Sequence, residues 1–244
     1  VLEQVEIHPC HLPAVPEKDF PLWLPPLGEY TASLTGYFRA QGVDAHALPH
    51  LNAHALSLGR AETSAKEYLP FPALLGGILA QQEVDPAPAQ FLIPQTQGAE
   101  ADGQYARVIR AVLDRRGNKR AKLVSPMLET LPATAQDRDA LFRALLAGDI
   151  LYAAPAAMRA GIAAAWDTLP GWAQLHKAAV EIGRCPATGR RLAAVGTPLC
   201  LTELDSGVLS TLEAEGSQLL RAPLSEALWF LWKDNMDANK PCAK

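Results

Sequence analysis

Two junctions between a loop and a helix carry the residues whose types and spacing suit ligand chemistry. The first covers residues 63–72, and the second covers residues 91–105, where an apolar, strand-like run ends in a Gly-rich turn. In open α/β sheets, ligands bind in the loops that follow the carboxyl ends of strands, and the backbone N–H groups of a helix N-terminus favour anions. The two junctions therefore predict a site for a small molecule or anion. Its candidate ligand-binding residues are Lys66, Glu67, Tyr68, Gly98, Glu100, Gln104 and Tyr105.

Metal chemistry has weaker candidates. Glu100 and Asp102 could share a hard cation, but this spacing is common in surface loops, so we assign no metal ligand to the chain. The four cysteines lie far apart and form no C-x-x-C pair; they are Cys10, Cys185, Cys200 and Cys242. This pattern favours a reducing cytoplasm over a disulfide framework. His8 and His11 flank Cys10, a zinc-like combination that lacks the remaining ligands of a closed site.

Composition narrows the classes of function. An apolar fraction of 49% and a charged fraction of 20% fit a soluble globular protein. A net charge of -4 argues against a nucleic-acid partner, and no apolar run reaches the roughly 18 residues of a membrane span. The one basic cluster, residues 110–122, is expected to be a solvated helix end, with a CoA phosphate or an acidic partner as the alternative. No nucleophile-elbow, P-loop or dinucleotide motif occurs, so catalytic residues stay unknown and enzyme activity stays open.

Strand and helix signals alternate along the chain. Apolar runs closed by turn residues predict strands at residues 20–27, 43–49, 89–94, 121–126, 191–198 and 218–223. Helical spacing predicts helices at residues 30–41, 66–82, 103–116, 206–215 and 225–233, and an Ala- and Leu-rich helical segment over 135–179. The apolar face of the third of these helices comprises Tyr105, Val108, Ile109, Val112 and Leu113, and Ser225 is expected to cap the last one. Such alternation indicates an α/β fold with a parallel sheet and right-handed crossovers.

These elements divide the chain into five expected segments. They are an extended arm (residues 1–20), a first α/β domain (21–134), a helical insertion (135–190), a second α/β part (191–233) and a loose tail (234–244).

The two junctions resemble the cluster-binding segments of the 2-hydroxyacyl-CoA dehydratase and benzoyl-CoA reductase family, in particular the dehydratase-like part of the CoA-substrate-specific enzyme activase proteins. Those segments typically read Glu-Cys-x-Pro and Gly-Pro-Cys-Arg-x-Gly-Gln-Tyr. The first cysteine position is Tyr68 here, and the second is Glu100. The resemblance extends over residues 20–232, with further support from residues 192–198 and 223–230. It implies flavodoxin-like parallel sheets with a helical insertion.

In that family a [4Fe–4S] cluster takes an electron from an ATP-hydrolysing activator and passes it to an acyl-CoA. Cluster ligands are soft thiolates, whereas Tyr68 and Glu100 offer hard oxygen atoms. We therefore expect no cofactor, and a cluster-less module that acts as a scaffold or as the partner of the activator or of a cluster-bearing subunit. One alternative is an iron–sulfur or other metal-dependent redox protein that uses the chain's own cysteines. Another is a module that binds acyl-CoA or a small anion.

Overall fold

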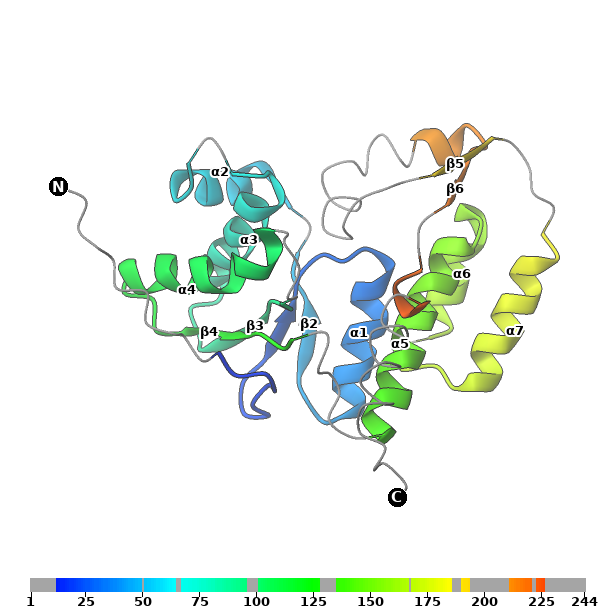
Figure 1. The fold of residues 1–244 in the computed structure, drawn as a ribbon, viewed down its shortest axis with the longest axis horizontal. Helices are drawn as coiled ribbons and strands as arrows, with labels where there is room; N and C mark the ends of the chain where they lie inside the picture. Colours follow the sequence, from blue (N-terminus) through cyan, green and yellow to red (C-terminus); the bar gives the residue numbers. More distant parts are fainter. Residues whose placement is uncertain are drawn as a thin grey trace, which may run out of the picture.

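A four-stranded, all-parallel sheet organises the protein. The computed structural model describes residues 12–49, 51–64, 67–95, 101–127, 135–166, 168–185, 190–193, 211–220 and 223–226. The strands are β1 (Leu22–Leu24), β2 (Ala45–Ala47), β3 (Ala89–Leu92) and β4 (Ala121–Val124), in the spatial order β2-β1-β3-β4. This is the order of a flavodoxin-like sheet, as expected, and Figure 1 shows the sheet between two groups of helices.

Helices cover both faces of the sheet. α3 (Pro70–Val84) and α4 (Tyr105–Arg115) share one apolar core with β3 and β4. α1 (Glu29–Ala40) and α5 (Ala135–Ala153) share the other core with β1. Because both faces are covered, the strands carry apolar side chains on both sides, and all four residues of β3 are buried. The strands expected at residues 20–27, 43–49, 89–94 and 121–126 are thus confirmed with shorter bounds.

One residue of β3 is polar although it is buried. Gln90 is 1% exposed, and its side chain is fully used by the N-terminal arm. The Glu17 N–H donates to Gln90 Oε1 at 2.8 Å, and Gln90 Nε2 donates to the carbonyls of Glu17 and Phe20. Lys122 adds an ion pair to Glu17 at 2.9 Å and lies over the Phe20 ring. The described part of the expected arm is therefore fixed to β3 and β4; residues 1–11 lie outside the described chain.

A helix that the sequence pattern did not indicate lies against α3. This helix, α2 (Ala53–Ala61), begins at Asn52, whose side chain accepts a hydrogen bond from the Ala55 N–H. α2 and α3 approach so closely that a Cβ on Gly59 would lie 1.8 Å from the Pro72 carbonyl oxygen. A Cβ on Gly76 would lie 1.8 Å from the Ala55 carbonyl oxygen. The helix expected from residue 66 begins instead at Pro70, because two prolines suit a first turn.

The C-terminal half is mainly helical, as expected. After α5 come α6 (Ala156–Ala164) and α7 (Trp172–Gly183), followed by a parallel pair of short strands, β5 (Arg191–Ala193) and β6 (Gln218–Leu220). Residues 211–214 and 224–226 are helical, and residue 215 lies in a turn. The rest of the helices expected at 206–215 and 225–233, residues 206–210 and 227–233, lies outside the described residues.

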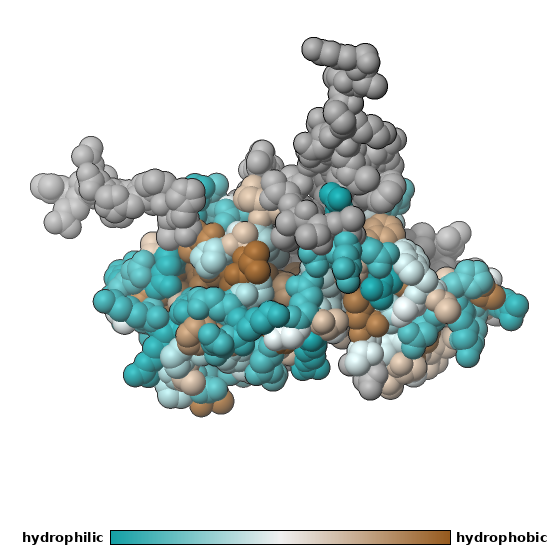
Figure 2. Space-filling model, turned by 90° about the horizontal axis from the view of Figure 1, so that it is seen from below, coloured by the Kyte–Doolittle hydropathy of each residue, from teal (hydrophilic) through white to brown (hydrophobic). Residues whose placement is uncertain are grey.

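The surface is polar over much of the face drawn in Figure 2, with apolar side chains in separate groups. Val108 is one of the exposed apolar residues, at 44% exposure, so its expected place on the buried face of α4 is wrong. The buried residues of α4 are Ala106, Ile109, Val112 and Leu113, which leaves Val108 at the edge of this stripe.

None of the helices in the described part of the chain combines the length and apolarity needed to cross a bilayer.

Candidate functional site

The carboxyl edge of the sheet at β1 and β3 is where this topology places a ligand. The chain leaves β1 for one face, through α1, and leaves β3 for the other face, through η1 (Ala101–Gln104) and α4. In open α/β sheets such a switch point forms the ligand-binding crevice. The loop after β1, the start of α3 and the start of α4 all lie at this edge.

The structure brings the starts of α3 and α4 together. The rings of Phe71, in the first turn of α3, and Tyr105, the first residue of α4, lie 5.0 Å apart. Tyr68 precedes α3 and is 73% exposed. Gln104 is also exposed and accepts a hydrogen bond from Arg107 at 3.4 Å. Glu67 accepts a bond of the same length from Ser64.

The other sequence-derived candidates, Lys66, Gly98 and Glu100, lie outside the described residues, and for Asp102 only the backbone is described. The described candidates are two aromatic residues, one carboxylate and one amide. These groups do not suit a [4Fe–4S] cluster, which is held by thiolates. They suit polar contacts to an organic ligand.

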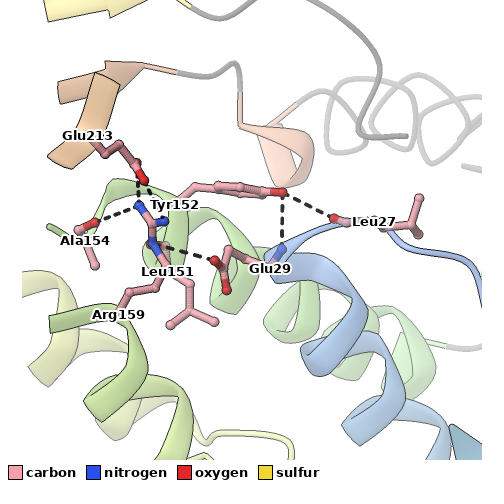
Figure 3. A network of polar contacts seen from close by, with 7 residues as sticks. All are labelled: Leu27, Glu29, Leu151, Tyr152, Ala154, Arg159 and Glu213. Carbon is pink, nitrogen blue, oxygen red and sulfur yellow. Dashed lines mark hydrogen bonds and ion pairs between the residues drawn. The ribbon is translucent and has the colours of Figure 1, made fainter. Parts of the chain in front are cut away.

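The junction between β1 and α1 is closed by the protein's own groups (Figure 3). The Tyr152 hydroxyl accepts a hydrogen bond from the Glu29 N–H at 3.2 Å and lies 3.4 Å from the Leu27 carbonyl oxygen, to which it donates. The Leu27 N–H donates to Thr31 Oγ1 at 2.6 Å. Gly28 allows the turn through its φ of 60°. The N–H groups of Leu27 and Glu29 at this junction are therefore already bound.

Three residues make this junction unsuited to an anion. Pro25 and Pro26 follow β1 directly and have no N–H to donate. The Glu29 carboxylate occupies the first turn of α1, where its negative charge satisfies the helix dipole.

At the neighbouring edge, between β3 and β4, polar groups also bind one another. The Gln95 amide donates to the Ser125 hydroxyl, which donates in turn to the Ile93 carbonyl at 2.7 Å.

A partly buried guanidinium links the β1–α1 junction to the C-terminal segments. The Arg159 side chain is 17% exposed and holds the Glu213 carboxylate through both Nη atoms, at 2.8 and 3.2 Å. Arg159 Nε also donates to the Leu151 carbonyl and lies 3.6 Å from Glu29 Oε1, while Nη2 donates to the Ala154 carbonyl (Figure 3). Burial acts to lower the pKa of Arg159, but the hydrogen bonds and charge of Glu213, with the charge of Glu29, raise it overall.

Beside it, the buried Tyr30 and the partly buried Asp149 form a second polar pair. The Tyr30 hydroxyl donates to Asp149 Oδ1. Asp149 also accepts the N–H groups of Leu224 at 2.9 Å and Ser225 at 3.1 Å. The ring of Tyr30 lies against α5 where Gly148 leaves room, since a Cβ there would be 2.2 Å from the ring. The expected cap by Ser225 is therefore wrong: the helical turn that begins at Leu224 is capped by a carboxylate from α5.

These polar residues were not among the sequence-derived candidates. The pair Arg159 and Glu213 is separated by 54 positions, and Glu29 and Tyr152 by 123. No local spacing rule could join them.

The Tyr30 hydroxyl should make the fold sensitive to alkali. Burial, reinforced by the hydrogen bond to Asp149, raises the pKa of Tyr30 above its ordinary value of 10.0. A raised pKa stabilises the fold while the group is protonated, so this contribution is complete below pH 10.0 and is lost as the pH rises further. We expect Tyr30→Phe to flatten the decline of unfolding free energy above that pH, measured by urea denaturation. The exposed Tyr68→Phe is the control, and an equal decline in wild type and Tyr30→Phe would contradict the prediction.

The basic cluster at residues 110–122 is largely paired within the protein. Arg115 and Arg116 both bind the Glu62 carboxylate at the end of α2, the latter at 2.6 Å. Arg110 donates to the carbonyls of Ala121 and Asn118. The cluster thus fixes α4 to its neighbours, in keeping with the expected solvated helix end.

Glu62 should contribute stability that disappears in acid. Hydrogen bonds from Arg115 and Arg116 lower the pKa of Glu62 below its ordinary value of 4.5. The stabilisation is therefore present above pH 4.5 and is lost as the pH falls through the lower folded value. We expect Glu62→Gln to lower the free energy of unfolding at neutral pH by less than about 1 kcal/mol, as for partly exposed pairs, and to have no effect in strong acid. The exposed Glu215→Gln serves as control, and a deficit that persists in acid would refute this assignment.

Of the four cysteines, one lies in the described part of the chain. Cys185 is a free, partly exposed thiol whose Sγ lies 3.3 Å from Met158 Sδ. Cys10, Cys200 and Cys242 lie outside the described residues. Within the described part of the chain, no group of three or more His, Cys, Asp or Glu side chains has an arrangement that could hold a metal ion.

Comparison with known proteins adds no relative to this picture. No protein-family model matches the chain, and no curated protein or solved structure does either.

Proposed function

We propose that this chain is a cluster-less α/β module that acts as a scaffold or partner subunit, resembling the electron-accepting component of 2-hydroxyacyl-CoA dehydratase systems. The observation that carries the proposal is the closed β1–α1 junction. Its N–H groups bind Tyr152 and Thr31, and its acidic Glu29 binds Arg159. The groups that usually hold a phosphate at a flavodoxin-like switch point are thus used to hold the chain's own helices.

The chemistry of the junction residues supports the same proposal. Tyr68 takes the position of a cluster cysteine, but a phenol is a hard ligand and this one is 73% exposed. The contact between Phe71 and Tyr105 places two aromatic rings between the junctions. The proposal therefore assigns the cluster to a separate partner subunit.

Metal analysis of protein purified without oxygen tests the cluster-less half of the proposal. We expect iron and acid-labile sulfide to be far below one per chain, with no visible absorption from a cluster. Stoichiometric iron and sulfide would overturn the proposal and support the redox alternative that uses the cysteines.

Anaerobic gel filtration tests the partner half. We expect the chain to co-elute with a cluster-bearing dehydratase subunit. Separate elution of the two proteins would contradict the role of a partner subunit.

A second candidate function is binding of an acyl-CoA at the starts of α3 and α4. It is favoured by the position of these helix starts, which lie side by side with the exposed Tyr68 ring and the exposed Gln104 amide at their rim. An exposed aromatic ring can stack on a purine, whereas the start of α3 offers few N–H groups to a phosphate, because Pro70 and Pro72 have none.

Calorimetric titration with acetyl-CoA tests whether the chain binds an acyl-CoA. If it is correct, binding is saturable and is weakened by Tyr68→Ala and by Gln104→Ala. Val84→Ala, which alters an exposed residue at the opposite end of α3, is the control. Absence of saturable binding to the wild-type chain would eliminate this candidate.

A further inference from the structure

Two polar anchors attach the C-terminal part of the described chain to α5 and α6. We call residues 211–220 and 223–226 the C-terminal strap. The first anchor joins Glu213 of the strap to Arg159 at 2.8 Å. The second joins the N–H groups of Leu224 and Ser225 to the Asp149 carboxylate. Both anchors attach the strap to the end of α5 and the start of α6, beside the N-terminus of α1.

Arg159 and Asp149, the residues to which the strap is anchored, keep other partners when the strap is open. Arg159 retains the carbonyls of Leu151 and Ala154 and the Glu29 carboxylate. Asp149 retains the Tyr30 hydroxyl. Opening of the strap therefore leaves neither charge buried and alone, which is the condition that makes breaking a buried pair costly.

Among the strap side chains that the structure describes, few are apolar and buried. Leu219 is buried and Leu224 packs partly against the core formed by α1 and α5. β6 pairs with β5 over three residues, and two short strands have little stability on their own. The four-stranded sheet, in contrast, has apolar cores on both faces. Segments with few buried apolar contacts open at lower free energy than the core.

We propose that the C-terminal strap opens as one unit while the four-stranded sheet stays folded. Its opening uncovers the edge formed by Tyr30, Asp149 and Arg159 at the N-terminus of α1. The strap is thus a lid over the closed β1–α1 junction. This conformational device does not depend on the function proposed above, because it rests on the two anchors and on the apolar contacts of the strap.

Hydrogen–deuterium exchange on the full chain tests whether the two anchors open together. Glu213→Gln weakens the first anchor, and Glu215→Gln, an exposed residue in the same helical turn, is the matched control. If the strap opens as a unit, Glu213→Gln accelerates exchange about tenfold at 211–216, and equally at 218–220 and 224–226. The reason is that the charge-assisted bond between Glu213 and Arg159 then holds the whole unit closed, so its loss favours opening of all three segments. Exchange in β3 stays unchanged, and Glu215→Gln matches wild type throughout.

A variant at the second anchor provides the reciprocal test. Asp149→Asn weakens the second anchor, and we expect it to accelerate exchange at 211–216, which it does not touch. Acceleration confined to the segment next to each substitution would overturn the proposal, because the anchors would then open independently. Equal acceleration in β3 would also overturn it, because the strap would then open only when the sheet unfolds.

Discussion

Gly76→Ala is expected to lower the free energy of unfolding by about 3 kcal/mol, at the upper end of the usual overpacking penalty. A Cβ at this position would lie 1.8 Å from the Ala55 carbonyl oxygen and 3.1 Å from the Gly59 nitrogen. Both atoms belong to the backbone of α2, so no side chain can rotate to make room. α2 must shift away from α3, and the apolar side chains beneath them lose contact. Urea denaturation of wild type and variant measures the difference.

Gly59→Ala probes the same contact from the opposite helix. Its Cβ would lie 1.8 Å from the Pro72 carbonyl oxygen, so we expect a similar loss. The double variant should lose less than the sum of the two, because the helix shift that accommodates one methyl group also accommodates the other.

Gly161→Ala is the matched control for both variants. Gly161 is a helical, exposed residue of α6, and a Cβ there would meet nothing within 4 Å. Replacing such a glycine by alanine should stabilise the protein by about 0.5–1 kcal/mol through helix propensity. A small effect of Gly76→Ala, equal to that of the control, would show that α2 does not lie against α3 in solution.

The contact between α2 and α3 also explains why the sequence pattern did not indicate α2. Its buried residues are Ala55 and Gly59, so the helix presents small side chains to its neighbour in place of a stripe of large apolar ones. Helix periodicity is recognised through large apolar residues. The strands were predictable for the opposite reason, since β1, β3 and β4 are short apolar runs bounded by turn residues.

The positions of the two junctions were predictable from the sequence, but the polar network beside them was not. The order of strands and helices places the starts of α3 and α4 at the carboxyl edge of the sheet, and both junctions could be found from local sequence. The network of Tyr30, Asp149 and Arg159 depends on how α5 and α6 cross the end of α1. That crossing is set by tertiary packing, for example by the space that Gly148 leaves for the Tyr30 ring.

Arg159→Met is expected to lower the free energy of unfolding by roughly 3 kcal/mol, at the upper end of the contribution of a hydrogen bond to a charged group. Methionine keeps an unbranched side chain of similar reach, so the change removes mainly the charge and the hydrogen bonds. The carboxylates of Glu213 and Glu29, 16% and 27% exposed, then lose their shared cation. The carbonyls of Leu151 and Ala154 lose a donor as well. Urea denaturation at neutral pH measures the loss.

Arg143→Met is the matched control. The Arg143 side chain is 20% exposed, close to the 17% of Arg159, but it pairs with a single carboxylate, Asp139, at 2.9 Å within the same helix. Such a pair contributes about 0.3–0.5 kcal/mol, and the bond from Arg143 to the Pro170 carbonyl adds roughly 1 kcal/mol. The loss should therefore be about half that of Arg159→Met.

The comparison of Arg159→Met with Glu213→Gln separates two roles of the guanidinium. Glu213→Gln removes only the link to the C-terminal strap, whereas Arg159→Met also removes the link between α5, α6 and α1. If Arg159 stabilises the junction of these three helices, Arg159→Met must cost clearly more in global unfolding than Glu213→Gln. Equal losses would mean that the guanidinium serves the strap alone, and that Tyr152, bound to Leu27 and Glu29, is sufficient to hold α5 against α1.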